Sequence, residues 1–158
     1  MHAVLAIVFS VYVLLCTESK PNSATTFYQY LVIYGSTAYF LVDEIMETFD
    51  GTSDFLTHLH HVAVLWGGLN FMLDHYGGHE YMLMLIAAEV SNPFLILRTM
   101  FKTIKYEQGL LLEIIEYAFA ISFVLCRTLI TNWIEFVMYE GENVGVYGKL
   151  CISFVNFI

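Results

Sequence analysis

The residues best placed to do chemistry are three histidines in the stretch DFLTHLHHVAVLWGGLNFML, which runs from Asp54 to Leu73. Asp54, His58 and His61 are spaced i, i+4 and i+7, which places them on one face of a helix, whereas His60 points about 100° away from His61. Ionisable groups inside membrane helices are costly and are therefore candidates for function. We predict that these histidines line a polar cavity. The alternative is that they lie near an interface and bond to loops or water.

A second polar cluster, EVSNPF (Glu89–Phe94), lies in the middle of a later apolar segment. Pro93 has no N–H and frees the carbonyl of Glu89, so we expect a helix kink there, with Ser91 or Asn92 capping the opened backbone. Glu89 either bonds to a neighbouring tyrosine or histidine, or faces the cavity of the histidines. The expected cavity residues are His58, His60, His61, Glu89, Ser91 and Asn92.

The two clusters are offset along antiparallel helices by about 8–11 Å, because the histidines begin one helix and Glu89 lies midway along the next. We therefore expect water or a lipid headgroup, and not a direct hydrogen bond, to join them. At least one of the three histidines should point inward toward Glu89. A charged group facing acyl chains instead would cost about 2.5–3.5 kcal/mol.

Metal chemistry fits the histidines poorly. The spacing H-x-H-H differs from the H-x-x-H-H boxes of membrane di-iron enzymes, and only His2, His75 and His79 lie elsewhere. We expect no metal and no cofactor; a mononuclear site that includes Glu89 is the alternative. The three cysteines have no close spacing, which indicates buried thiols and neither a disulfide framework nor a zinc site. Arg127 is expected to snorkel or to pair with an acid.

The composition indicates an integral membrane protein. The chain has 158 residues, of which 58% are apolar and 13% charged, and its mean hydropathy is +0.66. Soluble domains are less apolar and carry about 25% charged residues. We predict an all-α, polytopic transmembrane helix bundle. Its six apolar segments are His2–Cys16, Phe27–Val42, Phe55–Leu73, Tyr81–Leu97, Leu110–Trp133 and Leu150–Ile158.

The last segment, Leu150–Ile158, would reach only about 13 Å as a helix, too short to cross a bilayer. We therefore expect residues 1–158 to be one domain that lacks part of its N-terminal or C-terminal helices. A signal peptide is the alternative for the first 16 residues, but no Lys or Arg precedes Lys20.

The expected connections are short and polar: Thr17–Thr26, Asp43–Asp54 with five acids, the glycine turn Asp74–Glu80, and Arg98–Gly109. The last holds half of the basic residues, so the positive-inside rule places it in the cytosol. The net charge of −9 argues against nucleic acid and anionic lipid surfaces as partners.

The order of these motifs resembles the TLC family, named for TRAM, Lag and CLN proteins. The resemblance rests on the double histidine His60–His61 and on EVSNPFLILR (Glu89–Arg98), which is similar to a Glu-x-Ser-Thr-Pro-Phe pattern. YGSTAYFLVDEI (Tyr34–Ile45) resembles the helix with an acidic end that precedes the double histidine. MHAVLAIVFSVYVLL resembles the His-Ala start of an earlier helix. The similarity covers nearly the whole chain.

The resemblance implies a function in membrane lipid homeostasis with membrane lipids as partners, in the endoplasmic reticulum or another endomembrane, or in the plasma membrane. Ceramide synthases of this family continue with a His-Asp pair and another Asp, which do not follow here. An acyl-CoA-dependent N-acyltransferase is therefore an alternative, with His60 or His61 as general base and Glu89 as its partner. A trafficking protein for membrane cargo is a third possibility.

Overall fold

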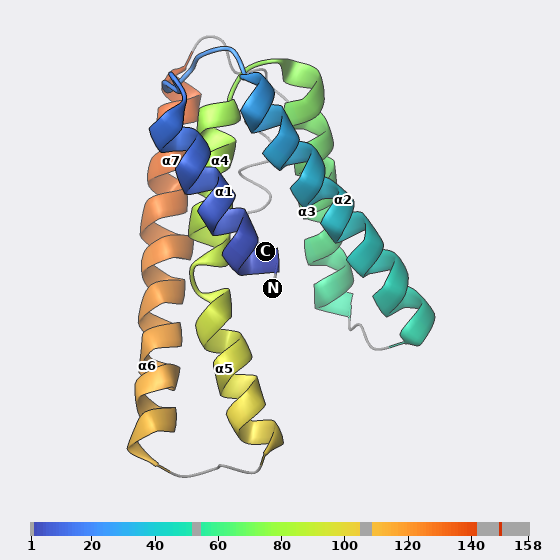
Figure 1. Ribbon diagram of the computed structural model, residues 1–158, viewed down its shortest axis with the longest axis vertical. Helices are drawn as coiled ribbons and strands as arrows, with labels where there is room; N and C mark the ends of the chain where they lie inside the picture. The colour runs from blue at the N-terminus through green and yellow to red at the C-terminus, as the bar shows by residue number, and fades with distance from the viewer. Residues whose placement is uncertain (1, 52–54, 105–108, 142–148, 150–158) are drawn as a thin grey trace.

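The computed structural model describes residues 2–51, 55–104, 109–141 and 149 of the chain. Within these residues it contains helices and no strand, which confirms the all-α fold class. The first three helices are α1 (His2–Cys16), α2 (Phe27–Asp50) and α3 (Phe55–Asp74). They follow the first three apolar segments of the sequence (Figure 1).

The second half begins with α4 (Gly78–Glu89) and α5 (Asn92–Thr103). A continuous column follows, made of α6 (Leu110–Val124), a π-helical segment η1 (Leu125–Ile130) and α7 (Thr131–Glu140). The sequence predicted a helix only as far as Trp133. The predicted segment Leu150–Ile158 lies outside the described residues.

Helix α2 is longer than predicted, and this is a correction. The acidic stretch from Asp43 was expected to be a connection, but the helix continues to Asp50 and ends at Gly51. Gly51 has φ 63°, a left-handed conformation that glycine adopts without steric cost. No glycine or proline interrupts the acidic stretch before Gly51, and three of its side chains pair with histidines of α3.

The start of α2 is fixed by its sequence as expected. Thr26 caps the helix, because its side chain accepts a hydrogen bond from the backbone N–H of Gln29, while Gln29 accepts from the backbone N–H of Thr26 at 2.8 Å. This reciprocal arrangement satisfies two donors that have no partner within the helix. The connection Thr17–Thr26 therefore ends where the sequence predicted.

The helices pack most tightly at the end of the bundle that lies at the top of Figure 1. A buried core unites α1, α2, α3, α4 and α7 there, through residues including Ala6, Ile33, Phe71, Met82 and Ile134. Toward the other end, the pair formed by α2 and α3 diverges from the pair formed by α5 and α6 (Figure 1). The loops at the packed end are joined, since the N–H of Thr25 bonds to the carbonyl of His75 at 2.9 Å.

Close packing of α2 on α3 depends on one glycine. A Cβ added to Gly68 would lie 2.2 Å from Oγ1 of Thr37 and 3.2 Å from its Cβ. Small residues allow two helix backbones to approach in this way. Of the two adjacent glycines Gly67 and Gly68, Gly68 is the one that permits this approach of α2.

The fourth apolar segment is interrupted where Pro93 predicted a kink. Helix α4 ends at Glu89, Val90 and Ser91 form a turn, and α5 begins at Asn92 with the proline in its first turn. The size of the bend stays a prediction. The predicted capping is wrong: Ser91 makes no side-chain capping bond, and Asn92 donates to the Glu89 carboxylate instead of to the backbone.

One segment of the described chain, Gly78–Thr103, is long and apolar enough by itself to cross a membrane, and α1 is a shorter apolar helix. The sequence had suggested several membrane spans, with Leu150–Ile158 too short to be one. Helix α2 is long enough but not apolar enough to be such a segment. Its last two turns contain Asp43, Glu44, Glu47 and Asp50. Helix α3 carries three histidines in its first two turns.

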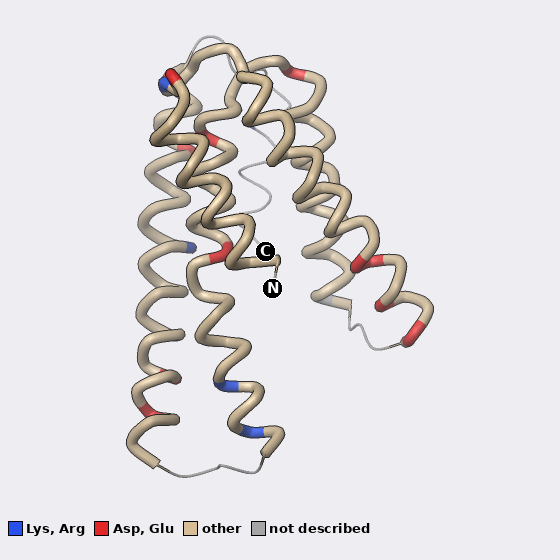
Figure 2. Tube along the Cα trace, in the orientation of Figure 1, with Lys and Arg blue, Asp and Glu red and all other residues tan. Residues whose placement is uncertain are grey.

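Helix α5 also extends further than predicted. Arg98 and Lys102 were assigned to the connection Arg98–Gly109, but they lie on the helix and both bond to Oε1 of Glu116, at 3.0 and 3.2 Å. These ion pairs join α5 to α6 and offset the charges of Arg98 and Lys102. Helix α5 continues to Thr103. Residues 105–108 of the expected connection lie outside the described residues. Figure 2 shows basic residues on the lower half of α5 and acidic residues at the lower end of α2.

We predict that the lower end of α5 faces the cytosol, because it carries Arg98 and Lys102. In a protein without native cysteines, Ile104→Cys should react with an impermeant maleimide from the cytosolic side. Ile104 is 72% exposed. Lys20→Cys, at the opposite end of the bundle, is the matched control and should react from the other side. Reaction of Ile104→Cys from the lumenal side alone would reverse this orientation.

Candidate functional site

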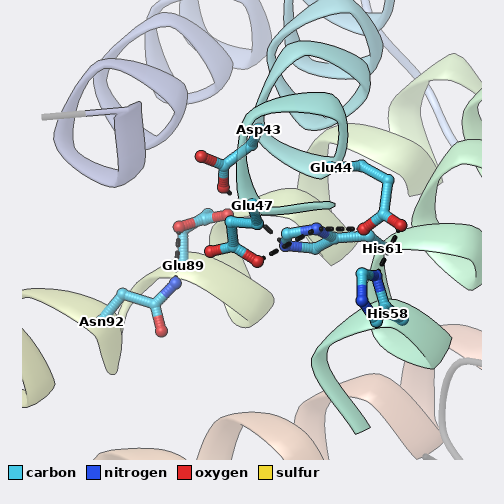
Figure 3. Close-up of polar contacts among 7 residues, drawn as sticks. All are labelled: Asp43, Glu44, Glu47, His58, His61, Glu89 and Asn92. Atoms are coloured by element: carbon cyan, nitrogen blue, oxygen red, sulfur yellow. Dashed lines mark hydrogen bonds and ion pairs between the residues drawn. The ribbon is translucent and has the colours of Figure 1, made fainter. Parts of the chain in front are cut away.

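His61 is the centre of a polar cluster between α2 and α3. It is buried, and its Nδ1 lies 3.0 Å from Oε2 of Glu44. Its Nε2 lies 3.8 Å from Oδ2 of Asp43, and Oε2 of Glu47 is 3.9 Å from Nδ1. Figure 3 shows the imidazole bracketed by these three carboxylates of α2. A buried imidazole is therefore surrounded by negative charge.

His58 shares the carboxylate of Glu44 with His61. Nδ1 of His58 lies 2.7 Å from Oε1 of Glu44, so each oxygen of the carboxylate serves one imidazole (Figure 3). Glu44 lies beyond Val42, where the apolar part of α2 ends. The hydrogen bond from His58 is the main reason that the pKa of the Glu44 carboxyl lies below its ordinary value. The group is therefore an ionised acceptor at neutral pH, and both histidines donate to it.

His60 has different surroundings from its two neighbours. Its ring lies edge-on to Phe40, with centroids 6.3 Å apart, and the charge of Arg127 is near enough to interact with it. The described contacts place no carboxylate oxygen within ion-pair distance of its ring nitrogens. The rings of His60 and His61 both contact Phe40 and lie 6.0 Å apart between centroids, but only His61 also lies among the α2 carboxylates.

Glu89 forms the second part of the site, at the break between α4 and α5. It is 3% exposed and accepts a hydrogen bond from Nδ2 of Asn92 at 2.8 Å (Figure 3). Arg127, in the π-helical segment η1, interacts with Glu89 and donates to the carbonyl of Ala88 at 3.3 Å. Arg127 therefore satisfies backbone next to the break, whereas the ion pairs of the described residues include none between Arg127 and an acid, so that pairing stays a prediction. Single π-helical turns are frequent at functional sites.

Tyr39 lies on α2, one turn before Asp43. Its phenol interacts with the carboxylates of Asp43 on α2 and Glu89 on α4. The ring of His2 stacks on Tyr39, with centroids 3.8 Å apart. The sequence predicted that Glu89 and the histidines would not bond directly, and the bonds of the described residues contain no such contact. The water or headgroup that we expect to join them stays a prediction.

The structure thus brings together some predicted residues and adds others. His58 and His61 belong to the polar cluster between α2 and α3, Glu89 and Asn92 bond to each other at the helix break, and Ser91 is buried without a side-chain hydrogen bond. Their assignment to one cavity, and the assignment of His60, His61 and Glu89 as catalytic, stay predictions. Within the described part of the chain, no group of three or more His, Cys, Asp or Glu is arranged to hold a metal ion.

Sequence reasoning missed Asp43, Glu44 and Glu47, because the acidic stretch was assigned to a loop. The signal was nevertheless present as helical periodicity. The buried side chains of α2 include Ile33, Ser36, Thr37 and Phe40, and the same stripe continues through Asp43, Glu44 and Glu47. Extending the stripe by two turns would have placed the acids opposite the histidines.

Two kinds of chemistry are open to this arrangement. A neutral imidazole whose Nδ1 donates to a carboxylate presents the lone pair of its Nε2 to a ligand. That lone pair can accept a hydrogen bond, or it can take a proton as a general base. The carboxylates around His61 would stabilise positive charge on the ring or on a bound group.

The model of the TLC domain family matches residues 1–157 of the chain. No curated protein and no solved structure matches the chain.

Proposed function

The chain belongs to the TLC domain family, and from that premise we propose that it is a multi-pass membrane protein that binds a membrane lipid and acts in lipid homeostasis. The family implies a membrane lipid-related function. The lipid's polar headgroup would bind at the cluster of His58, His61 and Glu44, and Glu89 would form the far side of the site.

The buried polar cluster is the observation that carries this proposal. Each charged side chain at the centre of a membrane helix costs about 2.5–3.5 kcal/mol on insertion scales. Glu89 is buried within the apolar segment Gly78–Thr103, and the buried imidazole of His61 lies beside the partly exposed carboxylates at the end of α2. The neighbouring histidines and Arg127 offset only part of that cost. A polar ligand would supply the remaining partners.

The outer surface supports a multi-pass arrangement. Large apolar side chains are exposed on α1, α2, α3, α6 and α7; Leu15, Phe49, Leu73, Tyr117 and Leu129 are each at least 60% exposed. Exposed apolar area of this extent is rare on soluble monomers. Acyl chains would cover it. We place the protein in the endoplasmic reticulum or another endomembrane, as the family suggests.

Acyl-CoA-dependent N-acyl transfer is the second candidate, and the Glu44–His61 contact favours it. A carboxylate that holds Nδ1 orients an imidazole for general-base catalysis. In such a step, Nε2 takes a proton from the amine as its nitrogen attacks the thioester carbonyl. The new C–N bond forms, the C–S bond breaks, and the proton passes to the leaving thiolate. The third alternative, trafficking of membrane cargo, does not require the cluster.

The proposal is tested by comparing lipid profiles of cells that lack the protein with cells that express it. We expect one lipid class to change in amount or acyl composition and to be restored on re-expression. An acyltransferase would leave its amine substrate in excess and its N-acyl product depleted. Unchanged lipid profiles together with misplaced membrane cargo would favour the trafficking alternative over ours.

A further inference from the structure

We propose that Glu44 is a positioning residue that holds His58 and His61 in one tautomer, with both Nε2 atoms free to accept hydrogen bonds. The functional pair of histidines is then His58 and His61, one helical turn apart, and not the adjacent pair His60–His61. This inference deepens the proposed function, because it concerns the same site, but its geometric basis is independent of which lipid binds.

The hydrogen-bond geometry supplies the first step. An ionised carboxylate only accepts hydrogen bonds. Oε1 of Glu44 lies 2.7 Å from Nδ1 of His58, and Oε2 lies 3.0 Å from Nδ1 of His61. Both Nδ1 atoms must therefore carry a hydrogen. In a neutral imidazole the other nitrogen, Nε2, is then an acceptor.

The free nitrogens define the class of ligand. Nε2 of His61 lies 3.8 Å from Asp43, beyond hydrogen-bonding distance. Two acceptor nitrogens beside the carboxylates of Asp43 and Glu47 would repel a phosphate or a carboxylate. They suit a group that donates hydrogen bonds, namely a hydroxyl or an ammonium. The inference is therefore that the site recognises the donor part of a lipid headgroup.

The packing of α2 on α3 makes this positioning rigid. Gly68 and Thr37 hold the two helices in close contact about two turns from the cluster. The ring of Phe40 lies edge-on to His61, with centroids 5.7 Å apart. Glu44 is one turn further along the same helix, so its carboxylate is carried by a fixed backbone. Rigid supporting elements of this kind hold a functional side chain in a productive geometry.

The test is the tautomer of each histidine, read from ¹⁵N chemical shifts of the ¹⁵N-histidine-labelled full chain in lipid nanodiscs, at a pH where the rings are neutral. His58→Asn and His61→Asn assign the two signals. We expect the Nδ1-protonated form for both rings in the wild type. In Glu44→Gln, one ring should switch to the Nε2-protonated form, because the amide offers one acceptor and one donor.

Asp50→Asn is the matched control, since it removes an exposed carboxylate from the same helix, and it should leave both tautomers unchanged. Nε2-protonated His58 or His61 in the wild type would overturn the inference even if Glu44→Gln failed to fold. An unchanged spectrum in folded Glu44→Gln would also overturn it. Neither result depends on lipid binding, so each is distinguishable from failure of the proposed function.

Discussion

In cells that lack the native protein, expression of His61→Ala should leave the lipid profile the same as an empty vector does. His61 is the one buried histidine among the described residues, and three carboxylates of α2 surround it. The loss of His61 would remove the proposed ligand contact and one of the two imidazoles that bond to Glu44. His75→Ala, an exposed histidine at the opposite end of the bundle, should restore the profile fully.

A folding defect must be separated from a loss of binding in this experiment. Removing the imidazole takes one of the two hydrogen-bond donors from Glu44, which can cost about 1–3 kcal/mol. His61→Gln keeps a donor for Glu44 and is the better-folded variant to compare. Protein amount and membrane insertion of each variant should be measured beside the lipids. If His61→Ala inserts into the membrane and restores the lipid profile fully, the cluster has only a packing role.

The second large effect is expected at Gly68. Gly68→Ala would place a Cβ 2.2 Å from Oγ1 of Thr37 and 3.2 Å from Cβ of Thr37. Turning the threonine side chain relieves the first contact but not the second, so α2 and α3 must separate slightly. Overpacking of this kind costs about 1–3 kcal/mol. The free energy of unfolding in detergent should fall by that amount, and Thr37→Ala in the same protein should recover part of it.

Gly35→Ala is the matched control for Gly68→Ala. Gly35 is also helical, but a Cβ there would meet nothing within 4 Å. Because glycine weakens a helix by about 0.5–1 kcal/mol relative to alanine, this variant should be as stable as the wild type or more so. Equal stability of the Gly35→Ala and Gly68→Ala proteins would show that the close approach of α2 and α3 does not limit stability.

The sequence predicted the helical class and most helix positions because apolar periodicity and caps are local signals. The connection Thr17–Thr26 was predicted to end where α2 begins, and Pro93 marked the break after Glu89. The end of α2 could not be placed in the same way. A run of acids reads as a loop when it is considered alone, and its helical form depends on histidines 14 to 17 residues away.

The candidate site was predictable in part for the same reason. His58 and His61 were placed on one face from their spacing alone, and Glu89 from its position before the proline. Arg127 and Tyr39 could not be connected to Glu89 from sequence, because they lie on other helices and their contacts depend on how those helices pack. Shared use of one carboxylate by two histidines is likewise a property of the tertiary fold.

Native mass spectrometry of the protein released from its own membranes tests the central claim most directly. We expect the wild type to retain a bound lipid whose headgroup carries a hydroxyl or an ammonium group. The inserted His61→Gln and Glu44→Gln proteins should retain much less of it, and Asp50→Asn should retain as much as the wild type. Equal retention of the same lipid by all four proteins would contradict a lipid site at this cluster.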